Sequence, residues 1–513
     1  MKKKPKIKNT TVVGIDLGTS NTAVAFYEDT GPKVIPNIDG EFTMPSVVHW
    51  PEKGGETMVG ASAWNLQLVE PERTFREFKR AMGTSEVFCK AGRKKVTATD
   101  LSVEALKHVS CSLDAHFGER EKRKAVITVP AYFLQDARQA TQAAAEKAGF
   151  EVIGIINEPT AAAVAYGLNE EQGDCVVLIV DIGGGTTDIT IGSKQGGEFE
   201  ALATDGDKHL GGKDVDDLLV AWFCDEFQRQ HGVEITEKDH PSERFTILEE
   251  MRRAKHALFA RQEIAVAARV GDKDLKLTLS RDKLAEMIAP LTERVRDLIL
   301  AAEKASGVKR EELKVLLVGG STRLMPIREM IKGIYGEDSI VGGRLSPDHA
   351  VSLGAAIHAM NLAIETEGGV VVNQQLEPIP APAGGKHKEA TAHGLGVAVG
   401  VPGKDERRMS EILKRNSPIP CKATKEYGSM SDTQTEFQVE VLQGREDQLV
   451  SESLVVASKQ LSLPPRSAKN ASLEVTMAYD RNGVCGVTVF DRVSKQSEEI
   501  TVDFTKKKTN ENN

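Results

Sequence analysis

The chain has 513 residues, of which 40% are hydrophobic and 27% charged, and its formal net charge is −9. This apolar content excludes a disordered chain, and at roughly 150 residues per domain the length suggests about three to four units. The acidic balance argues against a general binder of phosphate backbones, and the 5% aromatic content argues against base-stacking platforms. We therefore expect no nucleic-acid partner.

The cysteines and the N-terminus point to an ordinary cytoplasmic protein. No Cys-x-x-Cys pair occurs among the six cysteines, which argues against a zinc site or a disulfide framework and favours free thiols in a reducing compartment. Residues 1–8 are basic, but no apolar region long enough for a signal peptide follows. No apolar run reaches the roughly 18 residues of a membrane span, so we expect no membrane partner.

Three apolar, largely β-branched runs each predict a buried strand that ends in a tight turn. These runs, with the turns that follow them, are 12–17 before Gly18, Thr19, Ser20 and Asn21, 176–182 before Gly183, Gly184, Gly185 and Thr186, and 315–318 before Gly319, Gly320, Ser321 and Arg323. The first two runs share a strand-end aspartate (Asp16 and Asp181), a glycine two residues later and then a hydroxyl. This repetition predicts two similar α/β lobes that arose by duplication.

Helices are predicted between the strands. Residues 135–148 have a helix-forming composition, and Ser280 precedes an apolar stripe at helical spacing that runs from Leu284 to Leu298. Ser346-Pro347-Asp348 predicts the start of a helix over 350–364, with serine as N-cap and proline at the first helical position. Strands that alternate with helices indicate an α/β fold.

The composition changes near residue 370. Residues 373–391 are rich in proline, glycine and lysine and predict a linker. Short alternating runs over 394–400, 436–442, 473–479 and 486–491, with a hairpin turn at 480–483, then predict an antiparallel β-domain. The predicted division is a nucleotide-binding domain at 9–372, the linker, a β-sandwich at 392–504 and a polar tail at 505–513.

An Asp-x-Gly-Thr turn at the end of a strand suits a nucleotide phosphate. Glycine lets backbone amides approach an anion, and the following hydroxyl adds a donor. Asp16 and Asp181 are instead expected to hold Mg²⁺, through water, between two facing turns. One such turn alone is more often an ordinary β-turn, but three of matched design favour a nucleotide, and the absence of a GxxxxGK[ST] motif excludes a P-loop protein.

These turns also resemble a known family. Residues 15–21, the Asn-Glu-Pro-Thr-Ala-Ala-Ala run within 157–167, residues 181–188 and residues 318–326 are similar to the signatures of DnaK-type heat-shock chaperones. The resemblance extends from about Thr11 to Phe504. It implies an actin-like, two-lobed ATPase domain followed by a β-sandwich that binds extended hydrophobic peptides, with ATP or ADP and Mg²⁺ as ligands.

The resemblance also implies roles for individual residues. The implied catalytic set comprises Lys79, Glu158, Thr186, Asp188 and Asp181. The implied adenosine and phosphate contacts comprise Gly18–Asn21, Gly183–Thr186, Gly212, Arg252, Lys255, Gly319–Ser321, Arg323 and Asp348. Without the family, Lys79 reads as a surface lysine and Glu158 as an acid that complements a helix dipole. Pro130 and Arg138 match positions that, in the family, transmit conformational changes between the nucleotide-binding and substrate-binding domains.

Several positions depart from the family pattern. On the adenine-side helix, Arg252 and Phe259 replace an acid and a hydroxyl, which implies a different grip on adenosine, and Arg252 could stack on the base. Gly154 replaces the arginine that serves J-protein contact, and the leucine-rich acidic linker is missing. The resemblance implies a J-protein and a nucleotide exchange factor as partners. These departures weaken that inference.

The β-domain departs less from the family. Val397, Tyr427, Met430, Phe437 and Val439 match positions that line the peptide groove, although alternation alone cannot distinguish groove from sandwich core. Tyr427 and Met430 are bulky, which predicts a narrow groove. Residues 505–513 are too few for the family's helical lid, so we expect fast peptide exchange.

Three functions remain open from the sequence. The favoured one is a lidless ATP-dependent chaperone in which hydrolysis switches the affinity for unfolded clients. A nucleotide-sensing interaction protein with little hydrolysis is the alternative that the departures at Arg252, Phe259 and the linker favour. A sugar-kinase-like enzyme is a third, but it leaves the β-domain unexplained.

Overall fold

The structure, a computed structural model, describes the chain in segments. These are residues 12–52, 55–118, 123–167, 173–196, 198–342, 345–367, 382, 386–401, 404, 406–465, 472–481, 483 and 485–500. The first residues of the predicted nucleotide-binding domain (9–11), most of the predicted linker (373–381 and 383–385), the end of the predicted β-sandwich (501–504) and the predicted tail (505–513) lie outside them. None of the described helices is both long and apolar enough to cross a membrane.

Lobe I is built on a mixed sheet in which the strands run in the order β11-β10-β1-β2-β3. Its strands are β1 (Val12–Leu17), β2 (Asn21–Glu28), β3 (Gly31–Ile35), β4 (Met44–Pro45), β10 (Arg123–Val129) and β11 (Phe150–Asn157), with helices α2 (Ala98–Phe117) and α3 (Gln135–Lys147). A smaller outer part contains β5 (Val47–His49), β6 (Met58–Val59), α1 (Ala61–Leu66), β7 (Thr74–Arg76), β8 (Cys89–Ala91) and β9 (Lys94–Val96).

Lobe II repeats this topology, with the order β18-β17-β12-β13-β14. Its sheet strands are β12 (Cys175–Ile182), β13 (Thr187–Gln195), β14 (Glu198–Asp207), β17 (Leu313–Val318) and β18 (Ile340–Val341). The other elements are α5 (Gly212–His231), α6 (Pro241–Ala257), the hairpin β15 (Glu263–Val270) and β16 (Lys273–Ser280), α7 (Arg281–Ser306) and α8 (Met325–Tyr335). In both sheets the strand that ends in an aspartate pairs antiparallel with the next strand and parallel with a later one, which supports the predicted duplication.

Two helices, α4 (Glu158–Gly167) and α9 (Ala350–Glu367), join the lobes in one apolar cluster. They pack almost backbone to backbone, since a Cβ on Gly354 would lie 1.7 Å from the carbonyl oxygen of Ala161. The same holds where α9 crosses β1, because a Cβ on Gly14 would lie 2.1 Å from the amide nitrogen of Ala356. Helix α9 begins at Ala350, where the predicted range begins. Ser346 and Pro347 are not its N-cap and first residue, because Ser346–His349 form a turn in which the Ser346 carbonyl accepts the amide of Ala350 at 3.1 Å.

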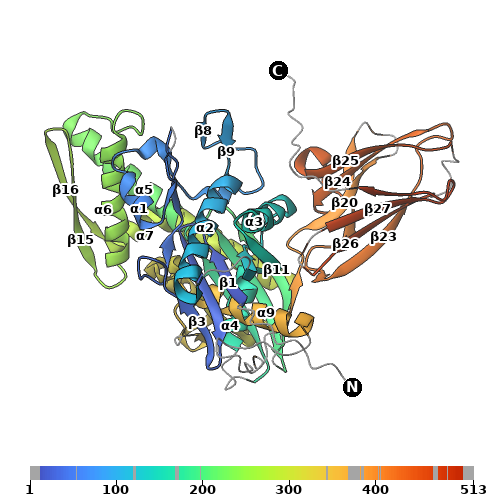
Figure 1. Ribbon diagram of the computed structural model, residues 1–513, viewed down its shortest axis with the longest axis horizontal. Helices are drawn as coiled ribbons and strands as arrows, with labels where there is room; N and C mark the ends of the chain where they lie inside the picture. Colours follow the sequence, from blue (N-terminus) through green and yellow to red (C-terminus); the bar gives the residue numbers. More distant parts are fainter. Residues whose placement is uncertain are drawn as a thin grey trace.

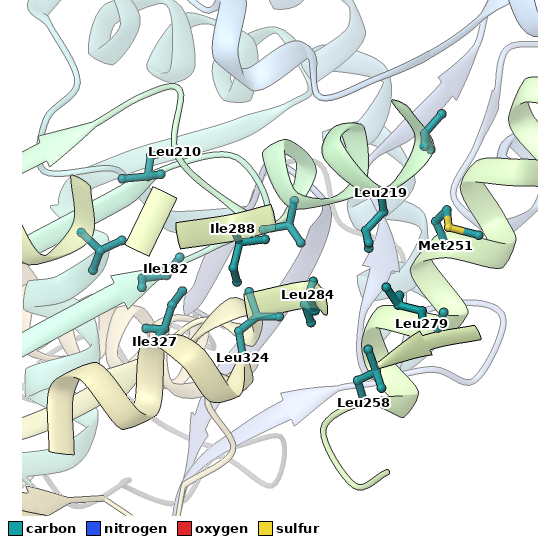
Figure 2. Packing of buried hydrophobic residues seen from close by; sticks show 14 of the residues in the cluster. Ile182, Leu210, Leu219, Met251, Leu258, Leu279, Leu284, Ile288, Leu324 and Ile327 are labelled. Atoms are coloured by element: carbon teal, nitrogen blue, oxygen red, sulfur yellow. The ribbon is translucent and has the colours of Figure 1, made fainter. Parts of the chain in front are cut away.

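The largest apolar cluster belongs to lobe II (Figure 2). Leu219 of α5, Met251 of α6, Leu284 and Ile288 of α7 and Ile327 of α8 all point into it. The predicted N-cap of α7 is present, because the Ser280 hydroxyl accepts the amide of Lys283 at 3.1 Å. This cluster holds α6 against the lobe and so places one wall of the cleft described below.

The C-terminal part is an antiparallel β-sandwich that stands beside the lobes (Figure 1). One sheet contains β20 (Gly394–Gly400), β21 (Arg407–Leu413), β24 (Glu436–Gly444) and β25 (Leu454–Ser462). The other contains β23 (Cys421–Tyr427), β26 (Leu473–Tyr479), β27 (Cys485–Asp491) and β28 (Ser497–Ile500).

The end of the predicted linker is a strand rather than irregular chain. Strand β19 (Lys386–Ala390) pairs in parallel with β14 of lobe II and antiparallel with the short strand β22 (Pro418–Ile419). The open edge of β14 supplies backbone partners that the linker's composition does not reveal. The sandwich is thereby attached to lobe II through main-chain pairing.

Candidate functional site

The turns after β1 and β12 face each other across a cleft of about 480 Å³. A Cβ on Gly184 would lie 1.8 Å from the Ser20 hydroxyl oxygen, and one on Gly185 would lie 2.4 Å from the Thr19 methyl carbon. Any other residue would force the turns apart, so glycine permits this approach. The structure therefore brings together the two turns that the sequence predicts to face each other.

Most of the predicted nucleotide residues line this cleft. They are Asp16, Gly18, Thr19, Ser20, Asn21, Glu158, Asp181, Gly183, Gly184, Thr186, Gly212, Arg252, Lys255, Gly319, Gly320, Ser321, Arg323 and Asp348. Of the predicted set, Gly185, Lys79 and Asp188 are outside the lining. Lys79 pairs with Glu158, a Cβ on Gly185 would meet Thr19, and Asp188 interacts with Glu158 through its charge. The lining also includes Thr43, Asp216, His256 and Phe259.

Four carboxyl groups and one lysine interact through their charges at the cleft: Asp16, Asp181 and Glu158 line it, and the buried Asp188 and Lys79 do not. Burial, followed by the charge of Glu158, raises the pKa of Asp16 and of Asp188 to about 7. The same two causes, together with the other aspartates, raise the pKa of Asp181 well above its ordinary value. The ammonium of Lys79, which lowers all three pKa values, is itself buried and paired with the Glu158 carboxylate.

Hydrogen bonds fix two of these acids. The Thr128 hydroxyl, at the end of β10, donates to Asp16 Oδ1 at 3.0 Å. The amide of Tyr132 donates to Asp188 Oδ1 at 3.0 Å. Both acids are therefore held at defined positions by lobe I, although Asp188 belongs to lobe II.

The acids fit a hydrated divalent cation better than a directly ligated one. Among the described residues, no group of three or more histidine, cysteine or acidic side chains is arranged to hold a metal ion. Mg²⁺ commonly keeps several waters and takes one or two carboxylates together with substrate phosphates. The buried acids outnumber the one lysine beside them, Lys79, and the uncompensated negative charge is the feature that fits such a cation.

The opposite wall of the cleft belongs to lobe II. Lys255 is buried, pairs with Asp216 at 2.7 Å and donates to the Gly212 carbonyl at 3.0 Å. Burial lowers the pKa of Lys255, and Asp216 opposes that effect. The Ser321 hydroxyl donates to the Gly183 carbonyl at 2.8 Å and ties the third turn to the second.

The third turn also carries a charged pair at the cleft. Arg323 pairs with Asp348 at 2.8 Å, and both residues line the cleft. Gly319 has a φ of +79°, and a Cβ there would lie 2.4 Å from the Ile182 carbonyl oxygen, so this turn requires glycine.

The two departures on α6 have specific surroundings. The Arg252 guanidinium lies over the Trp64 ring, 4.4 Å from its centroid, which is an arrangement other than the base stacking that the sequence suggests. The rings of His256 and Phe259 stack at 5.5 Å with an interplanar angle of 19°. Together they give this wall an aromatic surface.

Sequence reasoning missed several of these residues. Thr128 lies at the end of a buried apolar strand, and Asp216 interrupts the apolar face of α5 between Val215 and Leu219. A polar residue within an apolar stripe is a detectable signal for both. Trp64 carries no comparable signal, because its partner Arg252 is remote in sequence.

The predicted peptide residues divide into two groups. Val397, Phe437 and Val439 are buried in the core cluster of the sandwich, and Tyr427 packs against that cluster while its hydroxyl lies 3.2 Å from the Ser410 hydroxyl oxygen. Met430 is 77% exposed. Its terminal methyl lies 3.0 Å from where a Cβ on Gly400 would stand, so the loop before β24 meets the end of β20 there.

The linker strand β19 contacts lobe I next to Glu158. The Glu389 carboxylate on β19 accepts the amide of Asn157 at 2.6 Å, and the buried Arg138 donates to the Asn157 side chain. Asn157 directly precedes Glu158. On the other side of the interface, Arg415 of the sandwich pairs with Asp205 of β14 at 2.8 Å.

The chain is similar to known proteins over most of its length. A family model described as "Hsp70 protein" matches residues 12–372 and 392–513. The chain is 35% identical over 501 residues to "Chaperone protein DnaK" of Thermosipho africanus (strain TCF52B), covering 96% of this chain and 79% of that protein. It is also 35% identical over 490 residues to the protein of the same name from Thermosipho melanesiensis, covering 94% and 78%.

Proposed function

The chain belongs to the Hsp70 family and is an ATP-dependent chaperone, and from this premise we propose how its residues bind nucleotide, hydrolyse it and couple hydrolysis to peptide binding. Unfolded or extended polypeptides are its clients in this proposal. The close approach of the turns at Ser20 and Gly184 is the observation that most directly supports the nucleotide-binding part of this proposal.

In the nucleotide-binding step, the two turns hold the phosphates of ATP or ADP. Backbone amides and the hydroxyls of Thr19, Ser20 and Thr186 supply donors to the anion. The third turn and Lys255 lie toward adenosine. Asp16 and Asp181 would hold a hydrated Mg²⁺, which would supply neutralisation of the phosphate charge.

In the hydrolytic step, Lys79 stabilises charge on the terminal phosphate, while Glu158 and Asp188 orient the attacking water. Three observations support this assignment: the buried pair of Lys79 and Glu158, the fixed position of Asp188, and the raised pKa of Asp188. A carboxyl group with a pKa of about 7 is suited to exchange a proton near neutral pH.

Coupling to the sandwich proceeds through β19. The hydrogen bond from Asn157 to Glu389 connects the linker strand to the residue that precedes Glu158. A change at Glu158 during hydrolysis would therefore reach the strand that carries the sandwich. Arg138 stabilises the same asparagine from α3.

We further propose that J-protein stimulation is weak in this chain. A Cβ at Gly154 would lie 2.7 Å from Leu362 Cδ1, and the ring of His358 lies 3.6 Å away. Helix α9 thus occupies the space that an arginine side chain at position 154 would need in order to reach a J-protein.

The test is ATP turnover with and without an extended hydrophobic peptide, for the natural protein and for Lys79→Ala. We expect the peptide to stimulate turnover, and Lys79→Ala to lower it by about 10²–10³-fold while ATP still binds, because removal of one preorganised charge costs about that much. Lys107→Ala, which removes an exposed lysine paired with Glu104, is the matched control and should leave turnover unchanged.

Other results would point elsewhere. ATP binding without any turnover would support a nucleotide-sensing interaction protein. Turnover that persists in Lys79→Ala would remove Lys79 from the catalytic set.

A further inference from the structure

The two ends of the cleft differ in chemistry. One end is formed by the glycine turns after β1 and β12 and by the buried acids, and the proposed function places the phosphates there. The other end is lined from lobe II by Arg252, Lys255, His256 and Phe259 and by the third turn. This second end therefore remains for the nucleoside.

An aromatic pair forms the wall of the nucleoside end. Phe259 packs against the apolar cluster of lobe II and also lines the cleft, and its ring stacks on that of His256 at 5.5 Å. Leu258, which precedes it, points into the same cluster (Figure 2). The Arg281 guanidinium donates to the carbonyls of Leu258 and Phe259 at 2.9 Å each, which fixes the backbone beneath the ring. The wall is thus a preformed surface on which a base can stack.

Most of the charged side chains at this end are engaged within the protein. Lys255 pairs with Asp216 at 2.7 Å, and Arg323 pairs with Asp348 at 2.8 Å. The Arg252 guanidinium differs, because it forms no hydrogen bond or ion pair with another described residue and lies over an indole ring instead. Its N–H donors are therefore available to a ligand in the cleft that it lines.

These two features determine which bases the cleft can accept. Adenine and guanine have similar stacking surfaces and differ in the groups on their edges. An arginine donates well to the carbonyl oxygen and the adjacent ring nitrogen of guanine, whereas adenine carries an amino group in place of that oxygen. An apolar wall discriminates poorly between molecules of similar shape, and strong rejection requires a site that forms hydrogen bonds with one of them alone.

We propose that the cleft accepts purine nucleotides without selecting adenine, so that guanine and hypoxanthine nucleotides bind about as tightly as adenine nucleotides. The base stacks on Phe259 and His256, and Arg252 donates to the carbonyl oxygen of an oxopurine. The proposal rests on nucleotide binding in this cleft, as proposed above, and names the class of nucleotide that the cleft takes.

The experiment measures how unlabelled ADP, GDP, IDP and CDP displace a fluorescent methylanthraniloyl-ADP, which carries its label on the ribose. For the natural protein, we expect the dissociation constants of the three purine nucleotides to agree within about tenfold. The dissociation constant of CDP should be at least about tenfold higher than that of GDP, because a pyrimidine offers the smaller stacking surface. A preference for ADP over GDP of more than about tenfold would overturn the proposal.

Phe259→Ala tests the stacking. It should weaken the binding of ADP and GDP about tenfold each and that of CDP less, so that the preference for purines falls, which a general loss of structure would not produce. Phe88→Ala is the matched control, because Phe88 is also half-buried, packs edge-on against Phe75 in lobe I and is not part of the cleft lining. The control should stay within about twofold of the natural protein, and equal losses for GDP and CDP in Phe259→Ala would refute the contact between ring and base.

Arg252→Met tests the hydrogen bonds and leaves the aromatic wall intact. It should weaken the binding of GDP and IDP about tenfold and that of ADP less than about threefold. Arg253→Met is the control, because Arg253 pairs with Glu250 on the exposed side of α6, and it should change none of the affinities. Equal losses for all three purines in Arg252→Met would show that Arg252 does not read the base.

The assay also separates this inference from the proposed function. If the natural protein does not bind the labelled ADP, the nucleotide site itself is wrong and the inference falls with it. If the labelled ADP binds and only ADP displaces it, the nucleotide site stands and the inference alone is refuted.

Discussion

At the scale of single residues, the cleft contains more buried acid than the protein can neutralise. Asp16, Asp181 and Asp188 share one described lysine, Lys79, which is already paired with Glu158. Folding removes these carboxyl groups from water, and their mutual charge adds to the cost of ionising them. The nucleotide-free protein should therefore favour protonation, and binding of a cation should relieve the repulsion.

This gives a pH dependence for the stability of the nucleotide-free protein. Asp188 has a folded pKa of about 7 against an ordinary value of 3.8, so its stability contribution is complete below pH 3.8 and is lost as the pH rises through 7. We expect Asp188→Asn to raise the free energy of unfolding at pH 8 by on the order of 2–4 kcal/mol, since one pKa unit corresponds to about 1.4 kcal/mol. Calorimetry with chelator at pH 5 and pH 8 measures it.

Asp338→Asn, which replaces an exposed acid, is the control and should leave the free energy of unfolding unchanged at both pH values. A less stable Asp188→Asn at pH 8 would show that the hydrogen bond from the Tyr132 amide outweighs the charge repulsion. The same variant should lose turnover if Asp188 orients water, which separates its cost in stability from its use in hydrolysis.

At the scale of elements, the structure distinguishes residues of β24 that pack in the sandwich core from a residue in the preceding loop that is exposed, which the sequence could not do. Phe437 and Val439 alternate with exposed residues and face the sandwich core. Met430 lies in the loop before β24 and is exposed. Phe437 and Val439 therefore have a role in the core, and we propose that only the exposed Met430 can contact a peptide, even though all three match groove positions.

We predict opposite effects for two substitutions in this region. Phe437→Ala should lower the stability of the sandwich by about 3–4 kcal/mol through a buried cavity. Met430→Ala should change stability by less than about 0.5 kcal/mol, as is usual at an exposed site, but accelerate release of a labelled hydrophobic peptide several-fold. Denaturant unfolding and peptide dissociation measure the two effects, and unchanged dissociation in Met430→Ala would remove it from the peptide site.

At the scale of the whole molecule, a hollow of about 740 Å³ lies where the sandwich meets both lobes. His393 lines it and lies 3.2 Å, through Nε2, from the carbonyl oxygen of Tyr132 in lobe I. Burial lowers the pKa of His393 to about 4, and the nearby arginines Arg415 and Arg138 contribute to this. The docked arrangement therefore requires a neutral imidazole.

Acid should consequently weaken docking. His393 takes a proton more readily in the undocked state, so docking is intact above the ordinary pKa of 6.5 and is lost as the pH falls toward 4. At pH 5 the loss is about 2 kcal/mol. Small-angle X-ray scattering should show a larger radius of gyration at pH 5 than at pH 7, and His393→Gln should reduce the difference.

His116→Gln serves as the control, because His116 packs against Phe26 and Phe117 within lobe I, away from the sandwich. An equal expansion in His393→Gln and the natural protein would assign the pH response to another group.

Much of the fold could be predicted from local patterns. The β-branched runs predict β1 and the other turn-bearing strands because burial on both faces leaves a continuous apolar sequence. Gly184 could be predicted as part of a phosphate turn because the motif is local. The strand β19 could not, because its pairing depends on the open edge of β14 rather than on its own composition.

The sequence by itself determined the duplicated α/β lobes, the facing turns with Asp16 and Asp181, and the β-rich C-terminal part, since each depends on residues that are neighbours along the chain. Only the tertiary structure decided that Arg252 lies over Trp64, that Glu389 reaches Asn157, and that Phe437 faces the core while Met430 faces solvent. These features depend on which side chains the packed helices and strands bring together across long sequence separations, and local periodicity does not encode such pairings.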